Sequence, residues 1–350
     1  MTITAWFAVA LALPVLLLGE LLVRRIRLLS RFSIPAPVVG GLLLSLLVLI
    51  GNLTGWFAAK FETGVTTQWW TWLVTVEPEW LKAPSKNVNL PFLVAFFTCI
   101  GLNASWSLVK KGSLQVLIFL GIAGVLAVVQ NLIGVGLAKL LGVSPLLGVV
   151  CGSVTMTGGH GTALGFAADL EKAGLPNAAV IGVAAATFGL VAGGLIGGPV
   201  GGDLIRRRGL KPDAPAQTHL ESGQAGASGI IPDLRALAGF GKTFLAHLLL
   251  LLVVIKVGAW VSFVIQQAKI TFPVYMGAML LGMATRNLIE LGGGRWIKTE
   301  VIDTLASVTL GVFLAIAMMS LNLIELANAA LPMLIILAVQ VVVMAFYARF

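Results

Sequence analysis

The sequence predicts an all-α membrane protein that crosses the bilayer many times, and three observations carry that prediction. Of 350 residues, 58% are hydrophobic and 11% are charged, whereas a soluble domain is roughly 45–50% apolar and about 25% charged. Apolar segments of the length that a helix needs to cross a bilayer recur along the chain. Between two of them lies a glycine-rich stretch whose arms are too short to cross. An all-α polytopic fold with one irregular segment follows.

The apolar segments predict nine membrane-spanning helices. The first has no basic segment before it and is followed directly by arginines, so we expect a retained span and not a cleaved signal peptide. The expected spans are residues 4–23, 37–51, 90–109, 113–138 and 177–200 in the first part of the chain, and 243–265, 272–289, 302–323 and 331–347 in the second.

The basic residues indicate membrane topology and not a nucleic-acid surface. The formal charge is +9, but Lys and Arg lie between the apolar segments, where the positive-inside rule explains them. We therefore expect no nucleic-acid partner. Cys99 and Cys151 lie inside apolar segments, which argues against a disulfide. The tryptophan-rich residues 52–89 predict a loop anchored in the headgroup layer.

The irregular stretch, residues 144–170, reads SPLLGVVCGSVTMTGGHGTALGFAADL and predicts a re-entrant hairpin. Its apolar arms, residues 146–154 and 163–168, are far shorter than the roughly 20 residues of a spanning helix. The three glycines of its tip, TMTGGHGT, disfavour helix, so we expect irregular backbone there. Such backbone is tolerated at bilayer depth only where protein or a water-filled cavity receives it. The tip is therefore a candidate binding site.

The distribution of Lys and Arg predicts the orientation. If residues 144–170 return to their own side, the arginine-rich loop after residue 23 and the Arg206–Arg208 cluster share one face. The positive-inside rule makes that face cytoplasmic. The N-terminus is then outside, the hairpin enters from outside, and residues 201–242 form a flexible cytoplasmic linker.

A weak internal repeat predicts two related halves. Residues 37–44 resemble residues 273–280, with Gly41 opposite Gly277, and IGLN (100–103) resembles MSLN (319–322). The first half, residues 1–200, has five spans and the hairpin, an odd number of crossings, so its copy in residues 243–350 is expected to be inverted. Inverted repeats with a site near the membrane midplane are a recurrent design of secondary transporters.

Four motifs carry a resemblance to a known family. SVTMTGGHGT (153–162), ATFGLVAGGLIGGPV (186–200), IPAPVVGGLL (34–43) and FFTCIGLNAS (96–105) together resemble the sodium/glutamate symporters. The resemblance implies ten spans in two inverted halves, two re-entrant hairpins and a homodimer in the lipid of a bacterial cytoplasmic (inner) membrane. It implies uptake of L-glutamate coupled to Na⁺, with no organic cofactor. The family's second hairpin and tenth span would follow the ninth span, so the second repeat is expected to be truncated at Phe350.

Sodium is a hard cation that prefers oxygen ligands. Unwound backbone carbonyls and the hydroxyls of Ser153, Thr155, Thr157 and Thr162 are the candidate sodium ligands. The alternative is that these hydroxyls bond back to carbonyls of their own helices.

Glutamate requires hydrogen-bond donors for its carboxylates, and backbone amides and helix N-termini around the glycines suit that role. His160 is expected to donate to the substrate, carry a coupling proton or brace the hairpin. Polar side chains within the spans serve the site or join helices. The candidate substrate-binding residues are Thr157, Gly158, Gly159, His160, Gly161, Thr162, Asn103, Gln130, Asn131 and Thr187.

Three other functions remain open at this stage. A sodium- or proton-coupled transporter of another small carboxylate would use the same segments, and a passive channel would lack accumulation. An intramembrane hydrolase would use Ser153 and His160, but no nucleophile-elbow pattern and no orienting carboxylate accompany them. No enzymatic activity is therefore expected.

Overall fold

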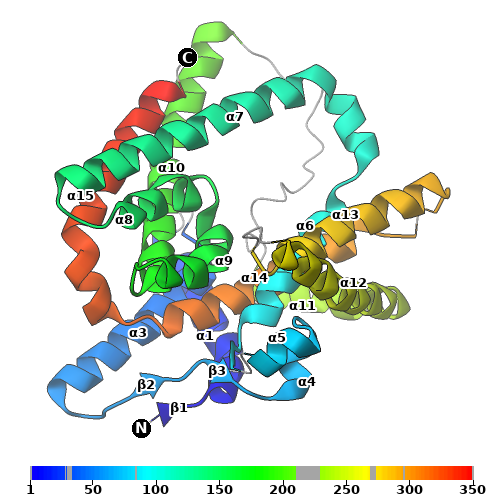
Figure 1. Ribbon diagram of the computed structural model, residues 1–350, viewed down its shortest axis with the longest axis horizontal. Helices are drawn as coiled ribbons and strands as arrows, with labels where there is room; N and C mark the ends of the chain where they lie inside the picture. Colours follow the sequence, from blue (N-terminus) through cyan, green and yellow to red (C-terminus); the bar gives the residue numbers. More distant parts are fainter. Residues whose placement is uncertain are drawn as a thin grey trace. The chain divides into compact units, whose positions relative to one another are not determined.

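The computed structural model describes residues 2–27, 29, 34–82, 85–209, 229–268, 273–294 and 296–348 (Figure 1). The chain forms two compact units, and neither is continuous in sequence. Unit 1 consists of Met1–Arg25, Pro35–Ser113 and Ser222–Leu321, and unit 2 consists of Ile26–Ile34, Leu114–Glu221 and Asn322–Phe350. Each unit therefore combines segments from both halves of the sequence.

Unit 1 is built mainly of helices, with short strands and turns between α3 and α6. β1 pairs in parallel with β2, and β3 pairs antiparallel with β4. Its longer helices are α1 (Ala5–Arg25), α3 (Ala36–Thr54), α6 (Leu90–Asn103), α11 (Ile230–Gly239), α12 (Lys242–Gln267), α13 (Met276–Leu291) and α14 (Thr299–Met319). Its shorter elements are β1 (Thr2–Ile3), β2 (Lys60–Phe61), β3 (Gly64–Val65), α4 (Gln68–Thr71), α5 (Glu77–Lys82) and β4 (Lys86–Asn87).

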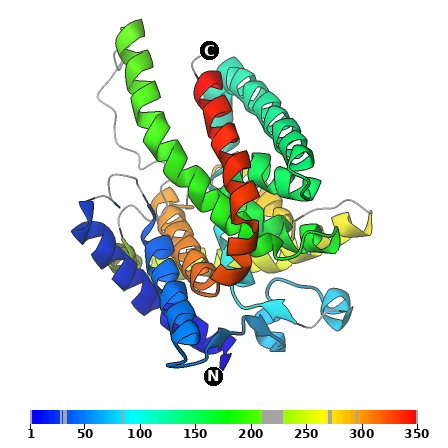
Figure 2. The ribbon, with the colours of Figure 1, turned by 90° about the vertical axis from the view of Figure 1, so that its left-hand side faces the viewer.

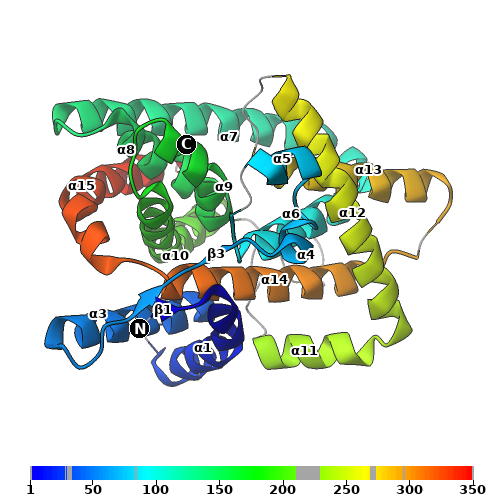
Figure 3. The ribbon, with the colours of Figure 1, turned by 60° about the horizontal axis from the view of Figure 1, so that its bottom comes forward.

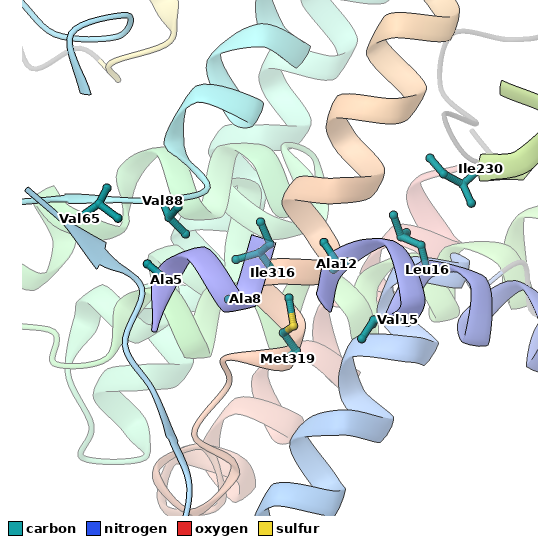
Figure 4. Close-up of a cluster of buried hydrophobic side chains, with 11 residues drawn as sticks. Ala5, Ala8, Ala12, Val15, Leu16, Val65, Val88, Ile230, Ile316 and Met319 are labelled. Atoms are coloured by element: carbon teal, nitrogen blue, oxygen red, sulfur yellow. The ribbon is translucent and has the colours of Figure 1, made fainter. Parts of the chain in front are cut away.

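A core cluster in unit 1 runs along one face of α1. Ala5, Ala8 and Ala12 recur at helical spacing, and their small side chains let α1 approach its neighbours closely. Figure 4 shows this face against Ile316 and Met319 of α14. Burial of such apolar surface contributes roughly 25 cal/mol per Å². The cluster joins α1 to a helix about 300 residues away, which makes unit 1 a single packed body.

The helices of unit 1 pack in matching pairs. α1 packs on α3 as α12 packs on α13, and α3 packs on α14 as α13 packs on α6. Figure 3 shows α1, α3 and α14 side by side. Close approaches within two of these pairs also match, because an added Cβ at Gly40 of α3 would meet Val15 O of α1, and one at Gly277 of α13 would meet Gly258 O of α12.

Unit 2 contains the predicted hairpin and the helices around it. Figure 2 shows α10 and α15 side by side, and α10 also packs on α9 and η1. A second core cluster includes Cys151 of η1, Ile181 of α10 and Ile336 of α15. The elements are α7 (Trp106–Leu140, of which the part from Leu114 belongs to this unit), α8 (Pro145–Val149), the π-helix η1 (Val150–Val154), α9 (Gly159–Lys172), α10 (Ala178–Arg208) and α15 (Leu323–Tyr347).

The prediction of an all-α polytopic membrane protein is confirmed. Among the described residues, six helices are long and apolar enough to cross a membrane. They are Ala5–Arg25, Ala36–Thr54, Leu114–Leu140, Lys242–Gln267, Thr299–Met319 and Ala330–Tyr347. Three of the other apolar helical segments are shorter: Leu90–Asn103, Pro145–Val154 and Ala178–Gly193.

The predicted span 90–109 is wrong at its C-terminal end. α6 stops at Asn103, Ala104 has non-helical dihedral angles (φ −79°, ψ 87°), and α7 begins at Trp106. Side chains of unit 1 hold this break. Asn103 Nδ2 donates to Asp303 Oδ1 over 2.6 Å, and the Trp106 amide donates to Asn287 Oδ1 over 2.6 Å. Local hydropathy carries no information about these partners, which lie about 180 to 200 residues away.

The predicted linker, residues 201–242, is partly helical. α10 continues to Arg208, and α11 occupies Ile230–Gly239, while residues 210–228 lie outside the described residues. α11 buries Ile230 and Leu237, and it packs on α14 and α1. The Ile230 amide donates to Glu20 Oε1, and Ser307 Oγ donates to Asp233 Oδ2 over 2.6 Å. Tertiary contacts therefore stabilise a helix in a segment whose composition predicts a loop.

Candidate functional site

The predicted hairpin is helical on both sides of a short break. Pro145 opens α8 at a position where its missing amide costs nothing, and Ser144 Oγ accepts a hydrogen bond from the Leu146 amide. The helix loses its regular path in η1, where Gly152 has φ −94° and ψ −133°. π-helical turns are rare in proteins, and those that do occur inside α-helices often lie at functional sites. The break in the first arm thus lies directly before the motif SVTMTGGHGT (153–162), which η1 overlaps at Ser153 and Val154.

The expectation that the glycine tip is irregular is wrong for residues 160–162, because α9 continues through them from its first residue, Gly159. The turn before it closes when the Thr157 and Gly158 amides donate to Ser153 O over 3.2 and 2.9 Å. Gly159 then has φ +72°, a conformation that favours glycine. Glycine disfavours the middle of a helix because its backbone is flexible, but Gly159 and Gly161 lie in the first turn of α9. The irregular backbone therefore lies at residues 152–159.

Two neighbouring amide side chains of α7, Gln130 and Asn131, hold this backbone in place. Asn131 Oδ1 accepts from the Ser153 amide and from Ser153 Oγ, each over 3.0 Å. Gln130 Oε1 accepts from Thr157 Oγ1 over 2.7 Å. An added Cβ at Gly152 would lie 2.6 Å from Asn131 Oδ1, so only glycine allows this approach. The structure thus brings together four of the residues that the sequence singled out.

The four predicted sodium-ligand hydroxyls fall into two pairs. Ser153 and Thr157 bond to side chains of α7, as described above. Thr155 Oγ1 instead donates to Val150 O over 2.6 Å, and Thr162 Oγ1 donates to Gly158 O over 2.9 Å. The second pair bonds back to its own segment, as the alternative interpretation expects. Each hydroxyl donates one proton and keeps acceptor capacity for a cation.

His160 and Thr187 join α9 to α10. The distance from His160 Nε2 to Thr187 Oγ1 is 2.9 Å, and Thr187 Oγ1 also donates to Val183 O over 2.9 Å. Because the hydroxyl has one proton and gives it to Val183, it accepts from His160. The network therefore assigns the proton of His160 to Nε2. Of the remaining tip residues, Gly158 is exposed, Gly159 is half-buried and Gly161 is buried.

Asn103 belongs to unit 1, whereas the other predicted site residues belong to unit 2. Its Nδ2 bonds Asp303, and its buried Oδ1 has no hydrogen-bond partner among the described residues. Beside it, Ser105 Oγ donates to Glu290 Oε2 over 2.6 Å, and Glu290 also pairs with Arg286. Within the described contacts Asn103 thus joins α6 to α14.

The sequence interpretation missed Gln340. This side chain of α15 is fully buried, and its Nε2 donates to the backbone oxygen of Gln130 over 2.6 Å. The sequence does contain a signal for it, because Gln340 is the only amide side chain in the apolar span 331–347. Its partner could not be identified from the sequence, because 210 residues separate the two glutamines.

Long apolar helices and a broken helical segment held by polar side chains define a multi-pass membrane protein of the transporter class. The chain belongs to the sodium/glutamate symporter family, whose model matches residues 1–77 and 79–350. The resemblance stated from the motifs is thereby confirmed.

Curated relatives support the same assignment. The chain is 34% identical over 340 residues to the sodium/glutamate symporter of Escherichia coli (strain K12), and the aligned residues cover 96% of this chain and 77% of that protein. It is also 34% identical over 350 residues to the sodium/glutamate symporter of Haemophilus influenzae, covering 100% of this chain and 80% of that protein. No solved structure matches the chain.

Proposed function

We propose that this protein is a secondary transporter that couples the uptake of L-glutamate to sodium. The observation that carries the proposal is the break at residues 152–159, whose backbone and hydroxyls are held by the Gln130–Asn131 pair in a chain of the symporter family. Helices broken within the membrane recur as substrate and ion sites in secondary transporters, because they free backbone groups for a ligand.

The two ligands differ in what they require. The carboxylates of glutamate are bound by backbone amides at the start of α9, where the helix dipole favours negative charge. Thr157, Gly158, Gly159, His160, Gly161 and Thr162 form this end of the site, and His160 braces it through Thr187. For Asn103, the bond to Asp303 supports the alternative role of joining helices.

Sodium is bound by neutral oxygens on the other side of the break. Ser153 and Thr157 are the stronger candidates, because their hydroxyls project onto α7 side chains. Thr155 and Thr162 are the weaker candidates, because both bond to carbonyls of their own segment. No organic cofactor takes part in the proposed mechanism.

We further propose the architecture that the sequence predicts. Residues 1–200 and 243–350 are inverted repeats, and the matching helix pairs of unit 1 support that relation. Residues 144–170 re-enter from outside, and residues 201–242 are cytoplasmic, which the distribution of Lys and Arg supports. The protein resides in the cytoplasmic (inner) membrane of a bacterium with its N-terminus outside, and acts as a homodimer.

The hydrolase alternative is disfavoured by the hydrogen bonds of its own candidate residues. Ser153 Oγ donates to Asn131, and His160 Nε2 bonds Thr187, so the two groups have different partners. A general base must be within hydrogen-bond reach of the proton that it removes. We therefore propose no catalytic activity. Transport of another small carboxylate would use the same helix end and differs only in the fit to the substrate.

Uptake of labelled glutamate into proteoliposomes tests the proposal. An inward sodium gradient is expected to drive accumulation above the external concentration, and an ionophore that collapses the gradient is expected to abolish it. Unlabelled aspartate and citrate are added as competitors to define the substrate class. Equilibration without accumulation would indicate a channel, and accumulation driven equally by potassium would contradict sodium coupling.

A further inference from the structure

Gln340 presents an oxygen that the protein leaves without a partner. Its side chain is fully buried in α15, and its Nε2 donates to the backbone oxygen of Gln130 over 2.6 Å. The reverse orientation of the amide would place two oxygens against each other, so this bond fixes which atom is Oε1. Oε1 is buried and has no hydrogen-bond partner among the described residues. A buried acceptor of this kind is costly within a membrane and calls for a donor or a cation.

The same glutamine is tied to the break in the predicted hairpin. Gln130 accepts from Gln340 through its backbone oxygen and from Thr157 through its side-chain oxygen. α15 also packs on α8 and η1, the first arm of that segment. The unpartnered oxygen therefore belongs to an element in direct contact with the segment where we place the transport site.

Counting acceptor capacity shows which oxygens remain for a ligand. Asn131 Oδ1 already accepts two hydrogen bonds from Ser153, which fills both of its lone pairs. Gln130 Oε1 accepts one hydrogen bond and keeps one lone pair, whereas Ser153 Oγ and Thr157 Oγ1 each donate their only proton and keep two lone pairs. Gln340 Oε1 keeps two. The remaining acceptors are neutral oxygens from α7, the break and α15.

We infer that Gln340 Oε1 is a ligand of the coupling sodium ion, together with Gln130 Oε1 and Thr157 Oγ1. The inference rests on the proposed function, since it assigns a ligand to the ion that drives that transport. Sodium fits better than the ammonium group of a substrate, because a single ion can reach a fully buried oxygen without bringing two carboxylates with it. Neutral carbonyl and hydroxyl oxygens are the ligands that sodium sites of broken helices use.

The test is Gln340→Met, which keeps the length of the side chain and removes the oxygen. The full-length transporter is purified, reconstituted and assayed for glutamate uptake over a range of sodium concentrations. The sodium concentration at half-maximal uptake is expected to rise about tenfold or more. The KM for glutamate at saturating sodium is expected to change less than about threefold. Gln115→Met is the matched control, because Gln115 is an exposed glutamine of α7, and it is expected to leave both values unchanged.

Gln340→Glu provides a second variant that does not depend on tolerance of methionine. A protonated glutamate side chain has the shape of glutamine, donates to Gln130 and keeps a carbonyl oxygen, so sodium dependence close to that of the wild type is expected at acidic pH. Unchanged sodium dependence in Gln340→Met would overturn the inference, because the oxygen would then be dispensable. A rise confined to the glutamate KM would overturn it as well, because it would assign Gln340 to the substrate.

Sodium binding without substrate separates this inference from the proposed function. Sodium added to the wild-type protein in detergent, without glutamate, is expected to raise its thermal unfolding temperature, since a ligand of the folded state stabilises it. The shift is expected to be lost in Gln340→Met and kept in Gln115→Met. An equal shift in Gln340→Met would contradict the ligand assignment even if the wild type transports glutamate. A sodium-dependent shift that is lost in Gln340→Met would support it even if the transported substrate is not glutamate.

Discussion

The two units use polar side chains in different ways. In unit 1, hydroxyls and amides bond to carboxylates, as in the pairs of Asn103 with Asp303, Ser105 with Glu290 and Ser307 with Asp233. In unit 2, the bonds around the broken segment join neutral groups, as in Asn131 with Ser153 and Gln130 with Thr157. The difference separates polar contacts that position helices from the polar contacts around the proposed transport site.

Electrostatics gives that difference a physical reason. Hydrogen bonds to an ionised group are roughly twice as strong as neutral ones, which suits a joint that must hold a helix end. A transport site must bind a cation and an anion and release both, so strong fixed charges would retain one ligand and repel the other. Neutral oxygens and backbone amides bind both ligands moderately. We therefore expect substitutions around the broken segment of unit 2 to reduce uptake, and matched substitutions in unit 1 to reduce stability alone.

The largest effect is expected from Gly159→Ala. Gly159 has φ +72° and open space around its Cα, and Gly55 at the end of α3 has φ +73° and open space as well. Alanine costs roughly 1–2 kcal/mol at either position, because an L-residue disfavours this conformation. At Gly159 the change also alters the orientation of the first backbone amides of α9, and misplacement of this kind can cost about 100-fold in activity. The loss is measured as glutamate uptake per folded molecule.

Gly55→Ala is the matched control for that prediction. It carries the same backbone strain in unit 1, so its thermal stability is expected to fall about as far as that of Gly159→Ala while its uptake stays near the wild-type value. Equal uptake by the two variants would show that the glycine of the tip serves packing or turn formation and not the site.

The next effect concerns the two asparagines that hold broken backbone. Asn131→Leu removes the acceptor for the Ser153 amide and hydroxyl. Leaving these groups unpaired costs about 2 kcal/mol, which corresponds to roughly a 30-fold loss of uptake if the strain falls on the transport site. Asn287→Leu removes the acceptor for the Trp106 amide in unit 1. It is expected to lower the unfolding temperature similarly but to change uptake per folded molecule less than about threefold.

The smallest effect is expected at His160. A glutamine side chain at this position can donate to Thr187 as the imidazole does, so His160→Gln is expected to lose less than about threefold in uptake, whereas His160→Leu loses about tenfold. Thr187→Val is expected to match His160→Leu, because it breaks the same contact from the other side. Uptake by all three variants is measured from about pH 5.5 to about pH 8. If His160→Gln were as inactive as His160→Leu, the imidazole would have a role beyond bracing.

Sequence reasoning recovered the parts of this fold that local composition determines. Hydropathy and length identified the apolar helices, and the small residues of SVTMTGGHGT marked the broken segment, because glycine and hydroxyl side chains disfavour regular helix. It did not recover the end of α6, the helix α11 or the role of Gln340. Each of these depends on a partner far away in sequence: Asp303 for Asn103, Glu20 for Ile230 and Gln130 for Gln340. A pattern within one segment does not identify a partner in another.

The most direct test of the account is protection of a cysteine at the break. In a background without Cys99 and Cys151, single cysteines are placed at the half-buried Val154 of η1, at Glu62 in the tryptophan-rich loop and at Arg207 near the end of α10. In intact cells an impermeant maleimide is expected to label Val154→Cys and Glu62→Cys, while Arg207→Cys reacts only after permeabilisation. Sodium with glutamate is expected to slow labelling of Val154→Cys several-fold and to leave Glu62→Cys unchanged. Labelling of Val154→Cys at the same rate with and without both ligands would contradict the assignment of the transport site to this segment.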